Sequence, residues 1–151
     1  MPVVKIFVVW IGKTKEPAIQ SLTDEYVKRI SRYAETSGLA LKDEASLRDL
    51  ARGLRNQPRH FLVLLDSGGK QMTSEDLAAF VQRHADAAAP PLLFAIGPAD
   101  GFSAQTRAAA DLTLSLGKMT LAHELARVVL LEQIYRAFTI LKKHPYHRAH
   151  G

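Results

Sequence analysis

Two side chains near the start of the last predicted helix have the clearest chemical potential in this sequence. His123 and Arg127 stand four positions apart, so a helix places them one turn apart on the same face. An imidazole can accept a proton near neutral pH, and a guanidinium can bind a phosphate or an oxygen on which negative charge develops. The pair is a candidate for acid–base catalysis and anion binding, although a histidine at a helix start can also simply bond to the backbone.

Glu132 and Arg136 form a second pair at helical spacing, on the opposite side of that helix. Such a pair is commonly a buried or interfacial ion pair. In a dimer it could instead complete the site of the partner subunit, which makes Arg136 a further candidate catalytic residue.

The basic C-terminal tail, residues 144–151, combines groups that suit RNA. Tyr146 can stack on a base, and His147 and Arg148 can reach a phosphate or a flipped-out nucleotide. His147 is a second candidate for the catalytic base. The preceding lysines, 142 and 143, indicate a phosphate-facing patch. Terminal residues often fray, but these residue types favour a functional tail.

The chain carries a net charge of +5, and most of it lies near the C-terminus. From residue 118 onward there are six Lys and Arg side chains but only two Glu side chains, so this segment holds +4 of the total, together with four of the six histidines. Such clustering favours a polyanionic partner, nucleic acid first. The alternative is a solvated basic tail that keeps the protein soluble.

The composition is typical of a globular protein, with 151 residues of which 47% are hydrophobic and 23% charged, and we expect one domain over residues 1–151. No apolar stretch is long enough to span a membrane, and the apolar run 3–11 lacks the cleavage site of a signal peptide. The absence of cysteine excludes disulfides, thiolate nucleophiles and cysteine-bound zinc. His144, His147 and His150 lack a fourth ligand and a helical register, so we expect no metal site. These features fit a cytoplasmic protein.

Strand-like and helix-like segments alternate along the chain. The predicted strands are 3–10, 39–42, 61–65, 92–96 and 111–116. The predicted helices are 16–33, 46–54 with Ser46 as its cap, one that starts at Thr73 or Ser74, 104–109 and 123–141. This order predicts an α/β fold with a mostly parallel sheet flanked by helices on both faces, in which ligands sit beyond the carboxyl ends of the strands.

The predicted helix 123–141 is apolar on every side, which is typical of a helix that is buried on more than one side. Packing on the sheet accounts for one side, and we expect a second copy of the chain to cover another. The sequence therefore predicts a homodimer. The alternative is a central helix in a monomer.

Glycine-containing loops follow three of the predicted strands, at 66–70, 97–101 and 116–121. If these strands are parallel neighbours, the loops open at the same edge of the sheet, where their backbone groups can grip a nucleoside-type cofactor. The sequence lacks the G-x-G-x-x-G motif and the P-loop motif, which argues against a nucleotide hydrolase.

The sequence resembles the RlmH/YbeA family of SPOUT-class RNA methyltransferases. The resemblance lies in the motifs TLAHELARV (120–128), LEQIYRA (131–137) and HPYHR (144–148), with support from FAIGPADG (94–101), residues 64–66 and 69–70, the opening strand and the segment 25–29. It spans essentially the whole chain.

The resemblance implies an α/β knot, the SPOUT fold with a C-terminal trefoil knot, a homodimer, and S-adenosylmethionine as the cofactor. It also implies, position by position, the following cofactor contacts: Leu65, Gly97, Pro98, Leu116, Gly117, Lys118, Met119, Thr120 and Leu121. The family usually has a second glycine at the position of Pro98. Because proline has no N–H, a cofactor contact through that amide would be lost, whereas one through the carbonyl would remain.

The implied reaction is methylation of N3 of a pseudouridine in 23S rRNA, within the assembled 70S ribosome. His123 or His147 would help N3 to lose its proton, and Arg127 would bind a phosphate or the uracil oxygen. Two alternatives stay open: a SPOUT-fold methyltransferase for tRNA or another rRNA site, and a non-catalytic ribosome-binding factor, which the proline at position 98 favours.

Overall fold

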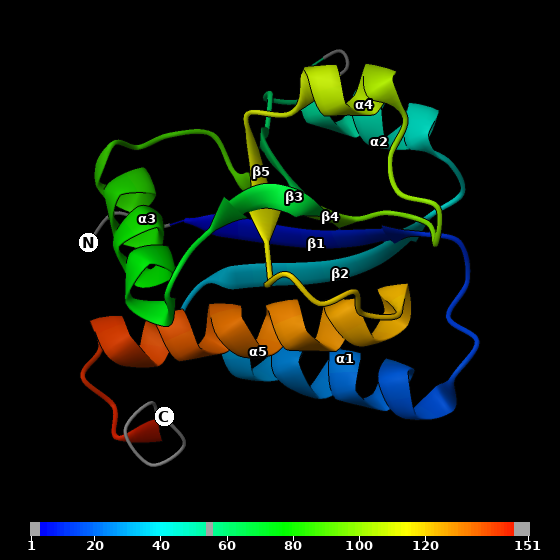
Figure 1. Cartoon of the computed structure of the whole chain (residues 1–151). Coiled ribbons are helices and arrows are strands. Elements are labelled where there is room, and N and C mark those ends of the chain that lie inside the picture. The colour runs from blue at the N-terminus through cyan, green and yellow to red at the C-terminus, as the bar shows by residue number, and fades with distance from the viewer. Residues whose placement is uncertain (1–3, 54–55, 147–151) are drawn as a thin grey trace.

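The computed structural model describes residues 4–53 and 56–146 (Figure 1). Its elements in chain order are β1 (Lys5–Ile11), α1 (Pro17–Ile30), β2 (Glu35–Leu41), α2 (Glu44–Arg52), β3 (Phe61–Gln71), α3 (Ser74–Asp86), β4 (Leu92–Ile96), α4 (Ala104–Ala109), β5 (Leu112–Ser115) and α5 (His123–Leu141). Within this part of the chain, no helix is long and apolar enough to cross a membrane.

The strands form one five-stranded sheet in the order β2-β1-β4-β3-β5, and every neighbouring pair is parallel. Helices α1, α3 and α5 cover one face, and the short helices α2 and α4 cover the other (Figure 1). The predicted α/β fold, with a parallel sheet flanked by helices on both faces, is confirmed.

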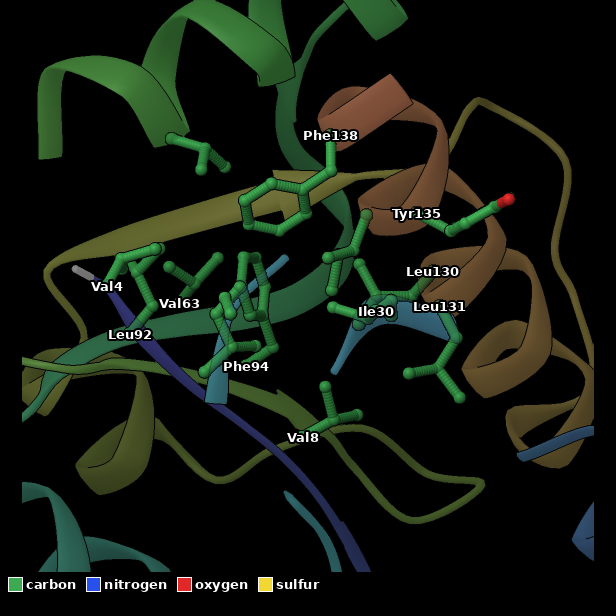
Figure 2. Close-up of a cluster of buried hydrophobic side chains, with 14 of the residues drawn as sticks. Val4, Val8, Ile30, Val63, Leu92, Phe94, Leu130, Leu131, Tyr135 and Phe138 are labelled. Atoms are coloured by element: carbon green, nitrogen blue, oxygen red, sulfur yellow. The ribbon is translucent and has the colours of Figure 1, made fainter. Parts of the chain in front are cut away.

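Alternating residues of the strands supply two separate cores, because successive side chains point to opposite faces of a sheet. Val8 and Trp10 of β1 point toward α1 and α5, whereas Val9 points toward α2. Figure 2 shows the larger core between the sheet and the long helices. Its labelled members are Val4, Val8, Ile30, Val63, Leu92, Phe94, Leu130, Leu131, Tyr135 and Phe138.

Two predicted strands are longer than their apolar patterns suggested. β2 begins at Glu35, before the predicted start at 39, because parallel pairing with β1 recruits an exposed, polar segment at the edge of the sheet. β3 continues to Gln71 where a turn was predicted at 66–69. Its ladder with β5 breaks after Leu65 and resumes at Lys70, so the four intervening residues bulge outward. A Cβ on Gly69 would lie 2.7 Å from the Thr113 backbone, so only glycine lets the strand return this closely.

The ends of α2 also differ from the prediction. Asp43 caps the helix, and the predicted cap Ser46 instead donates its backbone N–H to the Asp43 carboxylate at 2.8 Å. The helix ends at Arg52, short of the predicted 54, because Gly53 takes a φ of +72°. The remaining helix predictions hold to within about a turn, and Thr73 caps α3 in a capping box with Asp76.

A buried arginine fastens α5 to α1 and β1. Arg127 is 1% exposed, and its guanidinium lies 3.8 Å from the centre of the Trp10 ring. Its Nη1 donates to Thr14 Oγ1 at 2.9 Å and to Thr23 Oγ1 at 3.3 Å. Burial lowers the pKa of Arg127, because a charged group loses its hydration there. Nearby, the carboxylate of Glu124 accepts the backbone N–H groups of residues 15 and 16, so the first turn of α5 is fixed at two places.

Substitution of Arg127 should destabilise the protein mainly through lost packing. We expect Arg127→Ala to lower the free energy of unfolding by about 3 kcal/mol, and Arg127→Met by clearly less, because methionine keeps most of the buried volume while removing a costly buried charge. Urea unfolding of the three proteins measures this. Equal losses in both variants would show that the charge and its hydrogen bonds, not the packing, hold α5 in place.

A buried histidine makes stability depend on pH. His60 is 4% exposed and its ring meets that of Phe7 edge-on at 5.1 Å. Burial lowers the pKa of His60 from its ordinary 6.5, although backbone hydrogen bonds partly oppose the shift. The unfolded chain therefore takes up this proton more readily than the folded one. The resulting stability is complete above the ordinary pKa and is lost as the pH falls toward the folded value.

We expect the free energy of unfolding to decrease between about pH 7.5 and pH 5, and His60→Gln to remove part of that decrease, since glutamine cannot titrate. Chemical unfolding of both proteins across this range tests the expectation. The wild-type slope is the reference, and His144→Gln, at an exposed histidine, controls for the loss of an imidazole. If His60→Gln has that slope too, His60 does not carry the pH dependence.

Candidate functional site

A cavity of about 440 Å³ opens beside the bulge of β3 and the ends of β4 and β5. Its walls come from the start of that bulge, from the segments that follow β4 and β5, and from the start of α5. The lining residues are Leu65, Asp66, Ser67, Ile96, Gly97, Pro98, Ala99, Gly101, Leu116, Gly117, Met119, Thr120, Leu121, Ala122, His123 and Ala126. Every residue for which a cofactor contact was predicted lies on this wall, with the exception of Lys118.

The strand order explains why these segments meet. β3 lies between β4 and β5 and is parallel to both, so all three strands end at the same edge of the sheet. In open parallel sheets, ligands bind outside these carboxyl ends. The sequence predicted the loops at 66–70, 97–101 and 116–121. The pairing of β3 with both β4 and β5 brings them together around one cavity.

The loop after β4 is tightly folded at its first residues. Gly97 is buried, and a Cβ there would lie 3.0–3.1 Å from the ring of Phe102. Pro98 follows, and its carbonyl accepts the N–H of Gly101 at 2.9 Å, which closes a turn. Proline has no N–H, so this residue offers no amide donor to a ligand. Its carbonyl already accepts one hydrogen bond within the loop.

The loop after β5 is held by a serine and leaves an apolar side chain in solvent. Ser115 Oγ donates to the Gly117 carbonyl at 2.9 Å and accepts the Gly117 N–H at 3.1 Å. Gly117 has a φ of +141°, a conformation that favours glycine. Met119 is 87% exposed beside the cavity, which is unusual for a side chain of this type.

His123 lies on the cavity wall, at the first position of α5. Among the described residues no side chain caps this helix, so the N–H groups of its first turn, beside the cavity, lack a capping side chain. A helix start favours negative charge. The arrangement therefore places a proton acceptor next to a region that suits an anionic group.

Arg127 was predicted to share the site of His123, and the structure does not bring the two together. Its side chain points into the α1–α5 interface, where it is almost wholly buried, and it does not line the cavity. Its helical spacing from His123 is as predicted. In this conformation its guanidinium cannot reach a phosphate or a uracil oxygen.

Arg136 and Tyr146 lie together near the other end of α5. Arg136 Nε donates to Glu132 Oε2 at 3.1 Å, with 13% and 21% of these side chains exposed, so the expected ion pair is present and is partly buried. The Tyr146 ring meets that of Tyr135 edge-on at 4.8 Å, and the Arg136 guanidinium lies 5.3 Å from its centre. Tyr146 Oη donates to Glu132 Oε2 at 3.4 Å. The described part of the tail is thus packed against the helix.

The environment of Tyr146 keeps its hydroxyl protonated. Burial raises the pKa of Tyr146, and its hydrogen bond with Tyr26 and the negative charge of Glu132 raise it further. The side chain is therefore a hydrogen-bond donor and a stacking surface rather than a base. His147 and Arg148 lie outside the described residues.

Several residues of the cavity were not predicted from the sequence. Ile96, Ala122 and Ala126 are examples. The loop at 66–70 was predicted to grip a cofactor through its backbone groups, and the carboxylate of Asp66, which also lines the cavity, was given no role. Among the described residues, no group of three or more His, Asp or Glu side chains could hold a metal ion.

Known proteins and family models similar to this chain are methyltransferases. Residues 4–147 match the family model described as "Predicted SPOUT methyltransferase". A protein of Koribacter versatilis named ribosomal RNA large subunit methyltransferase H is 56% identical over 147 residues, which cover 97% of this chain and 99% of that protein. A protein of the same name from Geobacter sulfurreducens is 44% identical, with 95% and 99% covered.

A solved structure has a similar fold. The SpoU methyltransferase AviRb from Streptomyces viridochromogenes, determined in complex with AdoMet, superposes with a TM-score of 0.52 at 15% identity, covering 89% of this chain and 57% of that one. At this identity the likeness concerns the fold alone. A family model that matches nearly the whole chain, together with relatives of high identity along their full length, shows that the chain belongs to the RlmH family of SPOUT methyltransferases.

Proposed function

We propose that this protein is an S-adenosylmethionine-dependent methyltransferase that modifies N3 of a pseudouridine in 23S rRNA of the assembled ribosome. Two observations above give the strongest support. One is the 56% identity over nearly the full length of a relative named for large-subunit rRNA methylation. The other is a cavity lined by all of the predicted cofactor residues except Lys118. The site of action would be the cytoplasm.

The residues of the cavity fit an adenosyl cofactor. The volume of about 440 Å³ lies within the range of small-molecule sites, and most of the wall is apolar side chain or backbone. The buried Gly97 allows a ligand to approach the backbone closely. When bound, S-adenosylmethionine supplies an electrophilic methyl group on a good leaving group. The protein then has to orient the target nitrogen and exclude water.

His123 is the described residue best placed to move a proton at N3. It lies on the cavity wall, and imidazole is the side chain that accepts and releases protons near neutral pH. The burial of Arg127 leaves the stabilisation of the uracil oxygen to other donors. The uncapped first turn of α5 is one such group.

Arg136 and Tyr146 would reach the cavity only from a second subunit. Arg136 lies 13 residues after His123 on the same straight helix, a distance of about 20 Å. In Figure 1 the described residues after α5, 142–146, lie at the end of the helix opposite to its start at the cavity. An isologous homodimer that packs α5 of one subunit antiparallel to α5 of the other would bring Arg136 and Tyr146 to the partner's cavity. Leu125, which is 45% exposed on α5, and the partly buried Val128 suit such an interface.

We also infer a trefoil knot in the C-terminal part of the chain. Membership of the SPOUT family and the fold likeness to AviRb support it. The knot would fix the loop at 116–121 beside the loops after β3 and β4, which is where the cavity needs it.

Methyl transfer from labelled S-adenosylmethionine to unmodified 70S ribosomes tests the function, with 50S subunits and bulk tRNA assayed alongside. We expect label on 23S rRNA from 70S particles, and a loss of about 100-fold or more in His123→Ala, as is usual for a general base. The variant should keep its thermal stability and its cofactor affinity. Label on tRNA would support the tRNA alternative, and no label with no cofactor binding would support a ribosome-binding factor.

Mixing two inactive variants tests the shared site. His123→Ala and Tyr146→Ala homodimers should each be inactive, and after subunit exchange about a quarter of wild-type activity should return, because each mixed dimer has one site with both native residues. The assay is the same methyl transfer. If mixing restores nothing although mass spectrometry shows mixed dimers, both residues act within one subunit.

A further inference from the structure

One carboxylate in the cavity has no role in the function described above. Among the described lining residues, Asp66 is the only acidic one, and 17% of its side chain is exposed. It follows the last core residue of β3, where the strand begins to bulge outward. A carboxylate on the wall of a mostly apolar cavity calls for a hydrogen-bond donor on the ligand.

The carboxylate is already oriented. Arg107 of α4 donates Nη2 to Asp66 Oδ1 at 2.9 Å, and the N–H of Gly68 donates to Oδ2 at 3.0 Å. Two donors on different elements fix the plane of the group, so little rotational freedom remains to be lost when a ligand binds. Each carboxylate oxygen can accept more than one hydrogen bond, so acceptor sites remain.

Arg107 also ties together two loops of the cavity. Besides its contact with Asp66, its Nε donates to the Phe102 carbonyl at 3.2 Å. The Phe102 ring packs where a Cβ of Gly97 would stand. The arginine therefore links the end of β3 to the loop after β4. It lies outside the cavity wall and acts through Asp66 and Phe102, as a positioning residue.

We propose that Asp66 accepts a hydrogen bond from a ribose hydroxyl of the bound adenosyl cofactor and that Arg107 holds it in place, an inference that rests on the proposed function. Adjacent ribose hydroxyls are good donors to a carboxylate, which is how acidic residues bind the ribose in dinucleotide sites. The guanidinium already offsets the negative charge of Asp66. The remaining acceptor sites therefore suit neutral O–H donors better than the ammonium group of the cofactor's amino-acid part.

Calorimetric titrations of the full-length protein with ligands test the proposal without an activity readout. The ligands are S-adenosylhomocysteine, 5′-methylthioadenosine, which has no ammonium group, and the 2′-deoxy and 3′-deoxy forms of the latter. For Asp66→Asn we expect the Kd of S-adenosylhomocysteine and of 5′-methylthioadenosine, which carry both ribose hydroxyls, to rise about 10-fold or more. The reason is the loss of a hydrogen bond to a charged group. Removal of one of the two hydroxyls should weaken binding to the wild type by a similar factor and binding to Asp66→Asn by much less.

Controls separate this from a general effect on the loops. Asp100→Asn, an equivalent change at an exposed aspartate on the neighbouring loop, should bind all ligands as the wild type does. Arg107→Gln should weaken S-adenosylhomocysteine and 5′-methylthioadenosine more than it weakens the deoxy ligand that the wild type binds less tightly, because that ligand lacks the hydroxyl assigned to Asp66. Circular dichroism shows whether Asp66→Asn folds. If it does not fold, the affinities of the deoxy ligands are compared between Arg107→Gln and the wild type.

Three results would overturn the assignment. A full effect of hydroxyl removal in Asp66→Asn would show that the hydroxyl bonds elsewhere. A loss confined to S-adenosylhomocysteine would assign Asp66 to the ammonium group. Wild-type affinity in Asp66→Asn would remove the residue from the site. If the wild type itself binds none of the ligands, the proposed function fails with it, whereas wild-type binding combined with any of the three results removes only the role of Asp66.

Discussion

Strand β3 pairs in parallel with β4 on one side and with β5 on the other, and the site depends on this double pairing. Three segments that are far apart in the chain leave the sheet at one edge because of it. The pairing with β5 requires a close return of β3 after its bulge, which Gly69 permits by lacking a Cβ against Thr113. A side chain there would push the two strands apart, and the loop after β5 would then leave the cavity.

In the proposed homodimer, helix α5 makes the cavity one half of a larger site. Its first turn forms part of the cavity wall, while its last turns carry Arg136 and the packed Tyr146. A helix is rigid over this length, so the two ends cannot approach each other within one chain. The same rigidity would make a second copy of the helix a precise carrier of those groups, since an antiparallel partner presents its last turns to the first turns of its neighbour.

Two arginines of α5 have different structural roles. Arg127 and Arg136 both lie on α5, and each contacts an aromatic ring. Arg127 is enclosed between α1 and β1 without a hydrogen-bonded carboxylate, so it acts as a packing element with two hydroxyl partners. Arg136 is paired with Glu132 and keeps part of its surface open. The two side chains are of the same type, so the difference in their burial determines which of them packs in the core and which keeps part of its side chain accessible.

The sequence by itself determined the order of strands and helices, the parallel sheet, the exact span of the last helix, the loops that form the cavity, and the family. Periodicity and capping are local properties, and long motifs are read directly from the chain. Only the tertiary structure decided that Arg127 is buried, that Asp66 faces the cavity beside Arg107, that β3 runs past its predicted turn, and that His123 lies far from Tyr146. These facts depend on which segments become neighbours. Strand pairing and helix packing fix that over distances at which no local sequence pattern carries information.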